Sequence, residues 1–131
     1  MKKITAAVIT ALLALSATSC GYNENYRATC LVSSEGNNRA YQSFSEFEGT
    51  RVLDLRNSDP DKDTLYYTAS LEQGSISVYI DYDGTKRDLF DIEGGEEIEA
   101  SLQGLDLSKV YIIIETDGNC IEGDLDFEIG S

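Results

Sequence analysis

The sequence contains no histidine, no tryptophan and a single proline among its 131 residues. Without histidine, the chain cannot form a Ser-His-Asp or Cys-His catalytic site, and it cannot bind zinc through imidazole. Catalysis would therefore fall to its carboxylates, as in a paired-carboxylate glycosidase. However, 24 acidic side chains bring some pairs together by chance alone. No glycine-rich phosphate loop precedes a helical pattern. These absences predict a protein that is not an enzyme.

The chain also lacks an apolar run long enough to cross a bilayer. Its longest run, residues 4–15, has about 12 residues, whereas a spanning helix needs roughly 20. Lys2 and Lys3 precede this run and small residues follow it, which is the order found in a secretory signal peptide. The sequence therefore predicts export, with residues 1–19 removed as a leader.

Two interpretations of the leader's end stay open. Ala17 and Ser19 suit ordinary signal peptidase, which would leave an unmodified Cys20. Alternatively, the four residues ATSC that end at Cys20 resemble the lipobox of bacterial lipoproteins, although leucine is more usual than alanine at the first position. That resemblance implies diacylglycerol on the Cys20 sulfur and fatty acids such as palmitate. At least two chains would then hold the protein stably on a membrane. Residues 20–25 would form a tether of about 20 Å on the extracytoplasmic side of a bacterial envelope membrane.

The mature chain is strongly acidic. Once Lys2 and Lys3 leave with the leader, eight basic residues face 24 acidic ones, a net side-chain charge of −16. Such a surface repels phosphate backbones, which excludes nucleic acid as a partner. Anionic lipid headgroups would repel it too, so the domain should stand off the bilayer except at its anchor.

The other two cysteines, Cys30 and Cys120, form an even pair if Cys20 is acylated. An exported domain with one such pair favours a disulfide, which would close a loop of about 90 residues. Such a bond would stabilise the fold by about 4–5 kcal/mol in the chain-entropy model. The alternative is two unpaired cysteines buried as small hydrophobic side chains.

The mature region alternates apolar and polar residues over short stretches separated by Gly, Asn and Asp. GSISVYIDYDG (74–84) and DLDFEI (124–129) show period two, which is typical of strands with one buried and one wet face. KVYIIIET (109–116) is apolar on both faces, which predicts a central strand. Further strands are predicted in the segments 26–32, 41–49 (an edge strand), 51–57, 63–71, 88–92 and 96–102.

These segments make seven to nine short, mostly antiparallel strands, with turn signals about every 8–12 residues. The predicted fold class is therefore all-β, a single β-sandwich or jelly roll over residues 26–131. Within residues 44–129, the order EGTRVLDL, LEQGSISVYIDYDG, VYIIIETDG and EGDLDFEI resembles small sandwich modules of secreted bacterial proteins, among them pre-peptidase C-terminal-type domains. The resemblance implies this fold, and binding, spacing or accessory roles.

One loop has the composition of a cation site. The stretch NSDPDKDT presents Asp59, Asp61 and Asp63 at alternate positions, which resembles the start of a calcium loop. It departs from the EF-hand pattern at Thr64, where glycine belongs, and at Ser70, where glutamate belongs. Ca²⁺ is therefore the one cofactor considered, and the alternative is a solvated turn.

Eight tyrosines offer a second kind of site. Tyr66 and Tyr67 should point to opposite faces of their strand, so that one is exposed, and Tyr79 should lie on a wet face. Exposed tyrosines can stack on sugar rings or anchor a protein partner, although they are also ordinary strand residues.

The sequence thus predicts a non-catalytic, membrane-anchored extracytoplasmic lipoprotein that interacts with an envelope protein or envelope component. The alternative hypothesis is a sandwich module that binds glycan or Ca²⁺.

Overall fold

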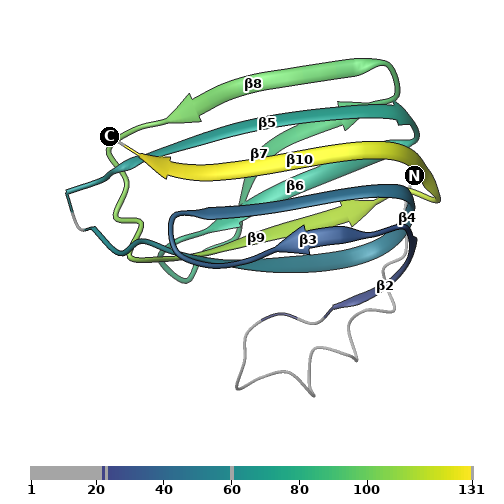
Figure 1. The fold of residues 1–131 in the computed structure, drawn as a ribbon. Helices are drawn as coiled ribbons and strands as arrows, with labels where there is room; N and C mark the ends of the chain where they lie inside the picture. The colour runs from purple at the N-terminus through teal and green to yellow at the C-terminus, as the bar shows by residue number, and fades with distance from the viewer. Residues whose placement is uncertain (1–21, 23, 60, 131) are drawn as a thin grey trace.

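The computed structural model describes residues 22, 24–59 and 61–130, and this part of the chain is built of strands (Figure 1). The strands are β2 (Asn25–Thr29), β3 (Val32–Ser34), β4 (Arg39–Arg56), β5 (Thr64–Gln73), β6 (Ser75–Asp81), β7 (Arg87–Glu93), β8 (Glu96–Leu102), β9 (Lys109–Thr116) and β10 (Cys120–Gly130). The all-β prediction is confirmed. Within the described residues, no helix meets the length and apolarity needed to cross a membrane.

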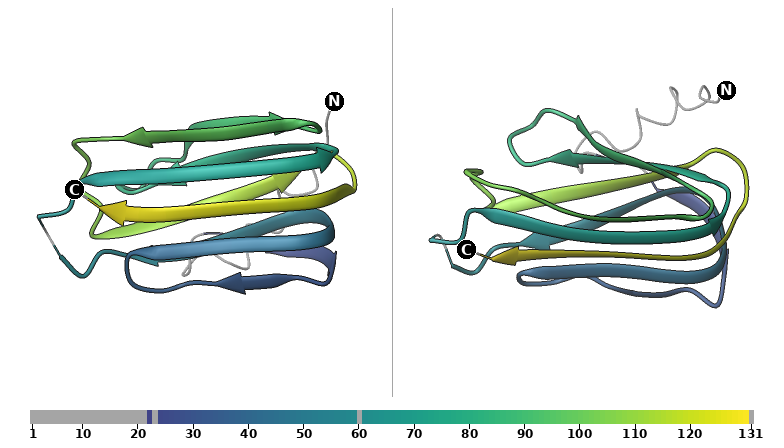
Figure 2. Two further views of the ribbon diagram at one scale, coloured as in Figure 1. Left: turned by 45° about the horizontal axis from the view of Figure 1, so that its top comes forward. Right: turned by 90° about the horizontal axis from the view of Figure 1, so that it is seen from above.

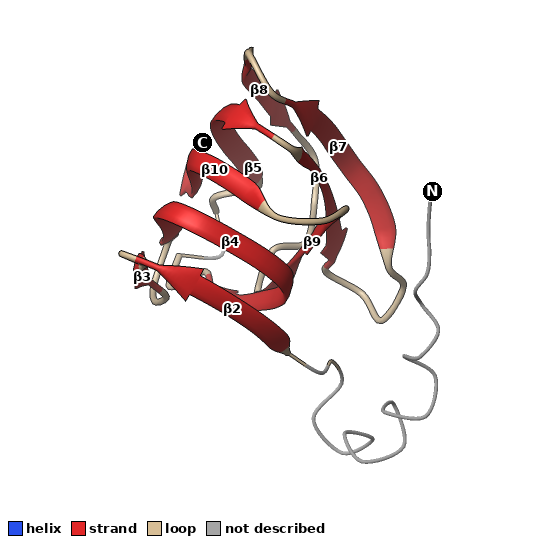
Figure 3. Ribbon diagram, turned by 90° about the vertical axis from the view of Figure 1, so that its right-hand side faces the viewer, coloured by secondary structure: helices blue, strands red, loops and turns tan. Residues whose placement is uncertain are grey.

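The strands form two facing layers (Figures 2 and 3). Their neighbour order is β7-β6-β9-β4-β10-β5-β8, with β2 and β3 paired along β4. All of these strand pairs are antiparallel. The first layer contains β2, β3, the first half of β4, β10, β5 and β8. The second layer contains the rest of β4, followed by β9, β6 and β7. The β-sandwich prediction is therefore confirmed.

Strand β4 belongs to both layers because it bends at Gly49. Residues 39–47 pair with β10, whereas residues 50–56 pair with β9. Gly49 has φ +124°, and a Cβ there would lie 2.2 Å from the backbone oxygen of Asn25. Only glycine tolerates this conformation and this close approach. The prediction of a separate edge strand over 41–49 is therefore wrong: the glycine marks a bend within one long strand.

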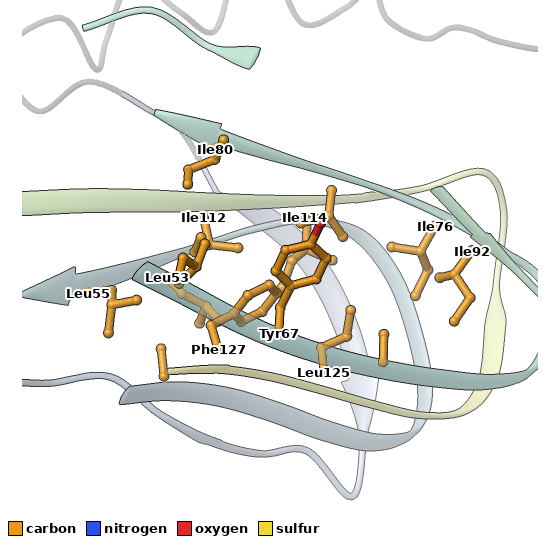
Figure 4. Packing of buried hydrophobic residues seen from close by; sticks show 14 of the residues in the cluster. Leu53, Leu55, Tyr67, Ile76, Ile80, Ile92, Ile112, Ile114, Leu125 and Phe127 are labelled. Carbon is orange, nitrogen blue, oxygen red and sulfur yellow. The ribbon is translucent and has the colours of Figure 1, made fainter. Parts of the chain in front are cut away.

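The core lies between the layers (Figure 4). Inward side chains come from alternate positions of each strand, among them Leu125, Phe127, Ile76, Val78, Ile80, Val110, Ile112 and Ile114. The period-two segments are thus assigned to the correct faces. Burying each such side chain stabilises the fold by roughly 1.5–3 kcal/mol relative to exposure. As predicted from its two apolar faces, β9 is central and lies between β4 and β6.

One polar residue interrupts this core. Gln42 of β4 is 0% exposed and points inward beside Leu125 of β10 and Ser33 of β3. Neither its amide nitrogen nor its amide oxygen has a hydrogen-bond partner within the described part of the chain. A buried amide without partners lowers the stability of the fold.

The two described cysteines are free thiols, and the structure does not form the predicted disulfide. Cys120 of β10 and Ala28 of β2 pair with Phe47 of β4 from opposite sides, so β2 and β10 are two strand spacings apart. Two spacings are about 10 Å, and Cys30 lies two residues beyond Ala28, whereas a disulfide needs Cα atoms within about 7 Å. The alternative prediction is two unpaired cysteines, both buried. Cys120 is buried but Cys30 is exposed, so this prediction holds for Cys120 alone.

Candidate functional site

The outer face of the first layer carries a hollowed, polar surface that runs along β5. Neighbouring side chains of β10, β5 and β8 form three rows across it. The rows are Asp124–Ser70–Glu97, Asp126–Thr68–Glu99 and Glu128–Tyr66–Ser101. These residues point outward because the residues between them point into the core, as Tyr67 and Phe127 do. We call this surface the β5 groove.

Two adjacent hollows lie in the β5 groove. One has a volume of about 550 Å³, and its lining includes Ser70, Glu97 and Asp124. The other, of about 120 Å³, is lined by residues that include Tyr66 and Glu128. Thr68 and Glu99 line both hollows. Because β10 and β8 flank β5 at one strand spacing each, their carboxylates form two lines about 10 Å apart. The floor between these lines carries two hydroxyls and one aromatic ring.

The groove is acidic. Its five carboxylates are opposed at its margin by Arg39 of β4, which leaves a net charge of −4. The Arg39 guanidinium binds Asp126 through two bonds, from Nε to Oδ1 at 3.1 Å and from Nη2 to Oδ2 at 2.8 Å. This hydrogen bonding raises the pKa of Arg39. The same guanidinium lies 5.3 Å from the centre of the Tyr41 ring, which extends the aromatic surface beyond β10.

Tyr66 is the exposed aromatic side chain of the groove, at 43% exposure. Its ring lies against the backbone of Gly130, where a Cβ would come within 2.9 Å of ring atom Cε2. The neighbouring strand therefore supports one edge of the ring and leaves part of its surface open to a ligand.

The other two predicted tyrosines lie elsewhere. Tyr67 is buried and stacks on Phe90 at a centroid distance of 5.3 Å, and burial raises its pKa. Tyr79 is half-buried on the outer face of the second layer, with Lys86 Nζ 4.2 Å from its ring centre, and burial raises its pKa as well. The prediction that Tyr66 and Tyr67 face opposite ways is confirmed. The three tyrosines do not form one site.

The predicted calcium loop lies between β4 and β5, and two of its three carboxylates accept hydrogen bonds from neighbouring residues of the chain. Oδ1 of Asp59 accepts a 3.0 Å hydrogen bond from the backbone nitrogen of Asp61, and Asp63 accepts one from the Thr64 hydroxyl at 3.1 Å. Within the described ranges, no three acidic, histidine or cysteine side chains are placed to hold a metal ion. The structure therefore does not gather Asp59, Asp61 and Asp63 into a Ca²⁺ site. Local turn formation accounts for Asp59.

Cys20, the predicted lipidation site, lies outside the described residues, as do residues 21 and 23. Of the residues 20–25 predicted as a tether, Asn25 is the first residue of β2. Tyr22 and Glu24 contact the folded domain.

Sequence reasoning missed the acidic side chains of the groove. Alternation within each segment placed Asp124, Asp126 and Glu128 on one outer face, and Glu97 and Glu99 on another. Nothing local in the sequence indicated that β5 would lie between those two strands.

No family model matches this sequence, and no curated protein matches it. Among solved structures, TmCBM61 in complex with β-1,4-galactotriose is 13% identical with a TM-score of 0.43, covering 86% of this chain and 90% of that one. A mutant of the family 29 carbohydrate binding module CBM29-2, complexed with mannohexaose, is 18% identical with a TM-score of 0.41, covering 84% and 79%. The Drosophila melanogaster CENP-C cupin domain is 14% identical with a TM-score of 0.35, covering 95% and 99%. At these TM-scores, the matches identify neither a family nor a ligand for this chain.

Proposed function

We propose that this protein is a non-catalytic lipoprotein of the bacterial envelope, anchored through Cys20, whose β5 groove binds a glycan chain. The observation that carries the proposal is the groove itself. It is an elongated outer surface in which the exposed Tyr66 ring and two hydroxyls lie between two lines of carboxylates.

The side chains of the groove suit a sugar. A tyrosine ring offers an apolar face for the C–H face of a pyranose, and its hydroxyl is a polar handle. Carboxylates accept hydrogen bonds from sugar hydroxyls, and bonds to charged groups contribute about 1.5–3 kcal/mol each. The lining residues come from three adjacent strands of one sheet, so the surface is formed before a ligand arrives. Preorganisation of this kind lowers the entropic cost of binding.

Binding is favoured over catalysis by the position of the carboxylates. Catalytic carboxylates are usually tuned by burial in a closed site. Here Asp124, Glu97, Glu99 and Glu128 are exposed on the outside of a sheet, where water screens their interactions.

The anchor is supported by the leader and by the residues that end at Cys20. A thioether-linked diacylglycerol supplies two acyl chains, which is enough for stable attachment. The domain would then work within a short distance of the membrane, because few residues separate Cys20 from β2.

Calorimetric titration of the purified mature protein in detergent tests glycan binding, with a panel of neutral and amino-sugar oligosaccharides. We expect at least one to bind, and Tyr66→Ala to weaken it about tenfold, equivalent to about 1.4 kcal/mol. Tyr79→Ala is the matched control because it removes a tyrosine from the opposite outer face, and it should leave affinity unchanged. If no oligosaccharide of the panel binds, or if the two variants lose affinity equally, the proposal of a glycan site in the β5 groove is overturned.

A second candidate ligand is a basic segment of an envelope protein, favoured by the net charge of −4 over the groove. Salt separates the two candidates. Binding of a basic peptide should weaken steeply as ionic strength rises, whereas binding of a neutral glycan should change little.

A further inference from the structure

The first described residues of the mature chain are bound to the second layer. The Tyr22 hydroxyl donates a hydrogen bond of 2.5 Å to Asp81 Oδ2, and its ring meets the Tyr111 ring edge-on at a centroid distance of 5.7 Å. Two residues on, Glu24 Oε2 accepts a 2.8 Å hydrogen bond from the backbone nitrogen of Val52. Tyr22 and Glu24 are therefore both held against the second layer.

The acceptor for Tyr22 is itself held in position. Asp81 is 7% exposed, and its Oδ1 accepts hydrogen bonds from the backbone nitrogens of Asp83 at 3.2 Å and Gly84 at 2.6 Å. Its other oxygen is thereby directed at Tyr22. Burial, followed by the bond to Asp81, raises the pKa of Tyr22, which keeps the hydroxyl protonated as a donor.

This contact lies on the face opposite the β5 groove. Asp81 of β6 pairs with Tyr111 of β9 in register, while their neighbours Ile80 and Ile112 point into the core. Asp81 and Tyr111 therefore point outward from the second layer. Figure 3 shows β6 and β9 in the layer that faces β10 and β5 across the core. Tyr22, the first described residue, therefore lies on the second layer's outer side.

Covalent geometry then limits where a lipid on Cys20 can be. Cys20 precedes Tyr22 by two residues, and two extended residues span at most about 7 Å. The two layers of a sandwich are themselves about 10 Å apart. A lipid on Cys20 would therefore lie beside the second layer, and the groove would lie beyond the full thickness of the sandwich.

We propose that the outer face of β9 and β6 faces the lipid headgroups, so that the β5 groove points away from the bilayer. This inference rests on the lipid anchor of the proposed function and is independent of the ligand bound in the groove.

The outer face of the second layer also carries tyrosines beside lysines. On the second layer, Lys86 Nζ lies 4.2 Å from the Tyr79 ring centre, and Lys109 Nζ lies 5.3 Å from the Tyr111 ring centre. Tyrosine is enriched at membrane interfaces, and lysine is attracted to anionic headgroups. The carboxylates of the groove would be repelled by the same headgroups. Lys86 also pairs with Glu115 at 2.9 Å, and the outer face further carries Asp54, Asp88 and Asp91, paired in register with Tyr111, Tyr79 and Ser77. This face is therefore acidic as well, and the orientation rests on the Tyr22 contact rather than on charge.

Fluorescence quenching in vesicles tests the orientation. The full-length protein, processed in bacteria and carrying Cys30→Ser, would receive a fluorophore at Asp88→Cys on the second layer or at Thr68→Cys in the groove. Both positions are exposed. The vesicles would contain phosphatidylethanolamine, phosphatidylglycerol and a lipid with a nitroxide headgroup. We expect quenching at position 88 to be several-fold stronger than at position 68.

Adding Tyr22→Ala should reduce the difference between the two probes, whereas Tyr41→Ala, on the groove side, should preserve it. Equal or reversed quenching in protein that stays on the vesicles overturns the orientation alone. Release of the protein from the vesicles overturns the lipid anchor and the orientation together.

Discussion

Arg51 donates a 2.8 Å hydrogen bond to the Tyr26 hydroxyl while its guanidinium lies 5.2 Å from the centre of the same ring. It also donates to the Ser33 hydroxyl at 2.9 Å. The largely buried Arg51 side chain of β4 thus links β4 to both β2 and β3, the two short strands at the edge of the first layer.

Arg51→Met should therefore loosen this edge. The substitution leaves the hydroxyls of Tyr26 and Ser33 without their donor, and it should lower the free energy of unfolding by about 1–3 kcal/mol. Urea denaturation measures the loss. Arg27→Met is the control, since the Arg27 side chain is 86% exposed in its pair with Glu48, and such surface pairs contribute little. Equal losses in both variants would contradict the role given to Arg51.

Gln42→Met should stabilise the protein. Methionine has a similar volume and removes an amide that finds no partner within the described residues. We expect the free energy of unfolding to rise by about 1 kcal/mol, because leaving a buried polar group unsatisfied costs about 1–3 kcal/mol. Thermal melting with and without urea checks the sign, and a clear loss would show that the amide is satisfied in solution.

Gly74→Ala and Gly84→Ala form a matched pair. Both glycines have positive φ, +109° and +96°, but a Cβ at 74 would lie 2.6 Å from Cys120 Sγ, whereas a Cβ at 84 meets nothing within 4 Å. Gly84→Ala should cost about 1 kcal/mol from backbone strain alone. Gly74→Ala should cost more, because the clash adds to the strain, and denaturant titration compares the two. Similar losses would show that the Gly74–Cys120 contact relaxes freely.

The two thiols should differ in reactivity. Cys30 is exposed and should react with a maleimide in the native protein, whereas burial of Cys120 raises its pKa and blocks access. Mass spectrometry should find one adduct on the native chain and a second after unfolding. An unreduced sample that takes no adduct even when unfolded would restore the disulfide.

The Asp83–Arg87 pair gives a pH-dependent signal. A hydrogen bond from Arg87 lowers the pKa of Asp83 below its ordinary value of 3.8. The folded state therefore binds this proton more weakly than the unfolded state does. The pair stabilises the folded protein fully at pH values above the pKa of Asp83 in the unfolded chain. This stabilisation is lost as the pH falls through the lower pKa of Asp83 in the folded protein. Carboxyl NMR titration should show the low value, and Arg87→Gln should raise it. An Asp83 titration unchanged by that variant would contradict the pairing.

The strands with the clearest alternation could be predicted from sequence. Within 75–81 and 124–129, each residue's inward or outward direction follows from period two and agrees with the structure. The apolar pattern on both faces of 109–116 likewise predicted a central strand. These properties depend on each residue and its near neighbours in the chain, which is why they can be predicted from the sequence.

Other features depended on contacts between distant segments. Cys30 and Cys120 suggested a bond by count, but β4 lies between Cys120 in β10 and the two strands that flank Cys30, β2 and β3. Gly49 suggested the end of one strand and the start of another. In the structure it is a bend within β4, because the residues before it pair with β10 and the residues after it pair with β9. Asp59, Asp61 and Asp63 suggested a metal by spacing, but Asp59 accepts a hydrogen bond from the Asp61 backbone nitrogen and Asp63 accepts one from the Thr64 hydroxyl.

By itself, the sequence determined that the chain is acidic, is built largely of strands and has no histidine for catalysis, and it determined which side chains of the regular strands point outward. Only the tertiary structure decided that β5 lies between two acidic strands and that Tyr22 binds the opposite layer. The reason is physical: pleating alternates side chains within a strand wherever that strand lies, but a strand's neighbours follow from how the whole chain buries its apolar faces.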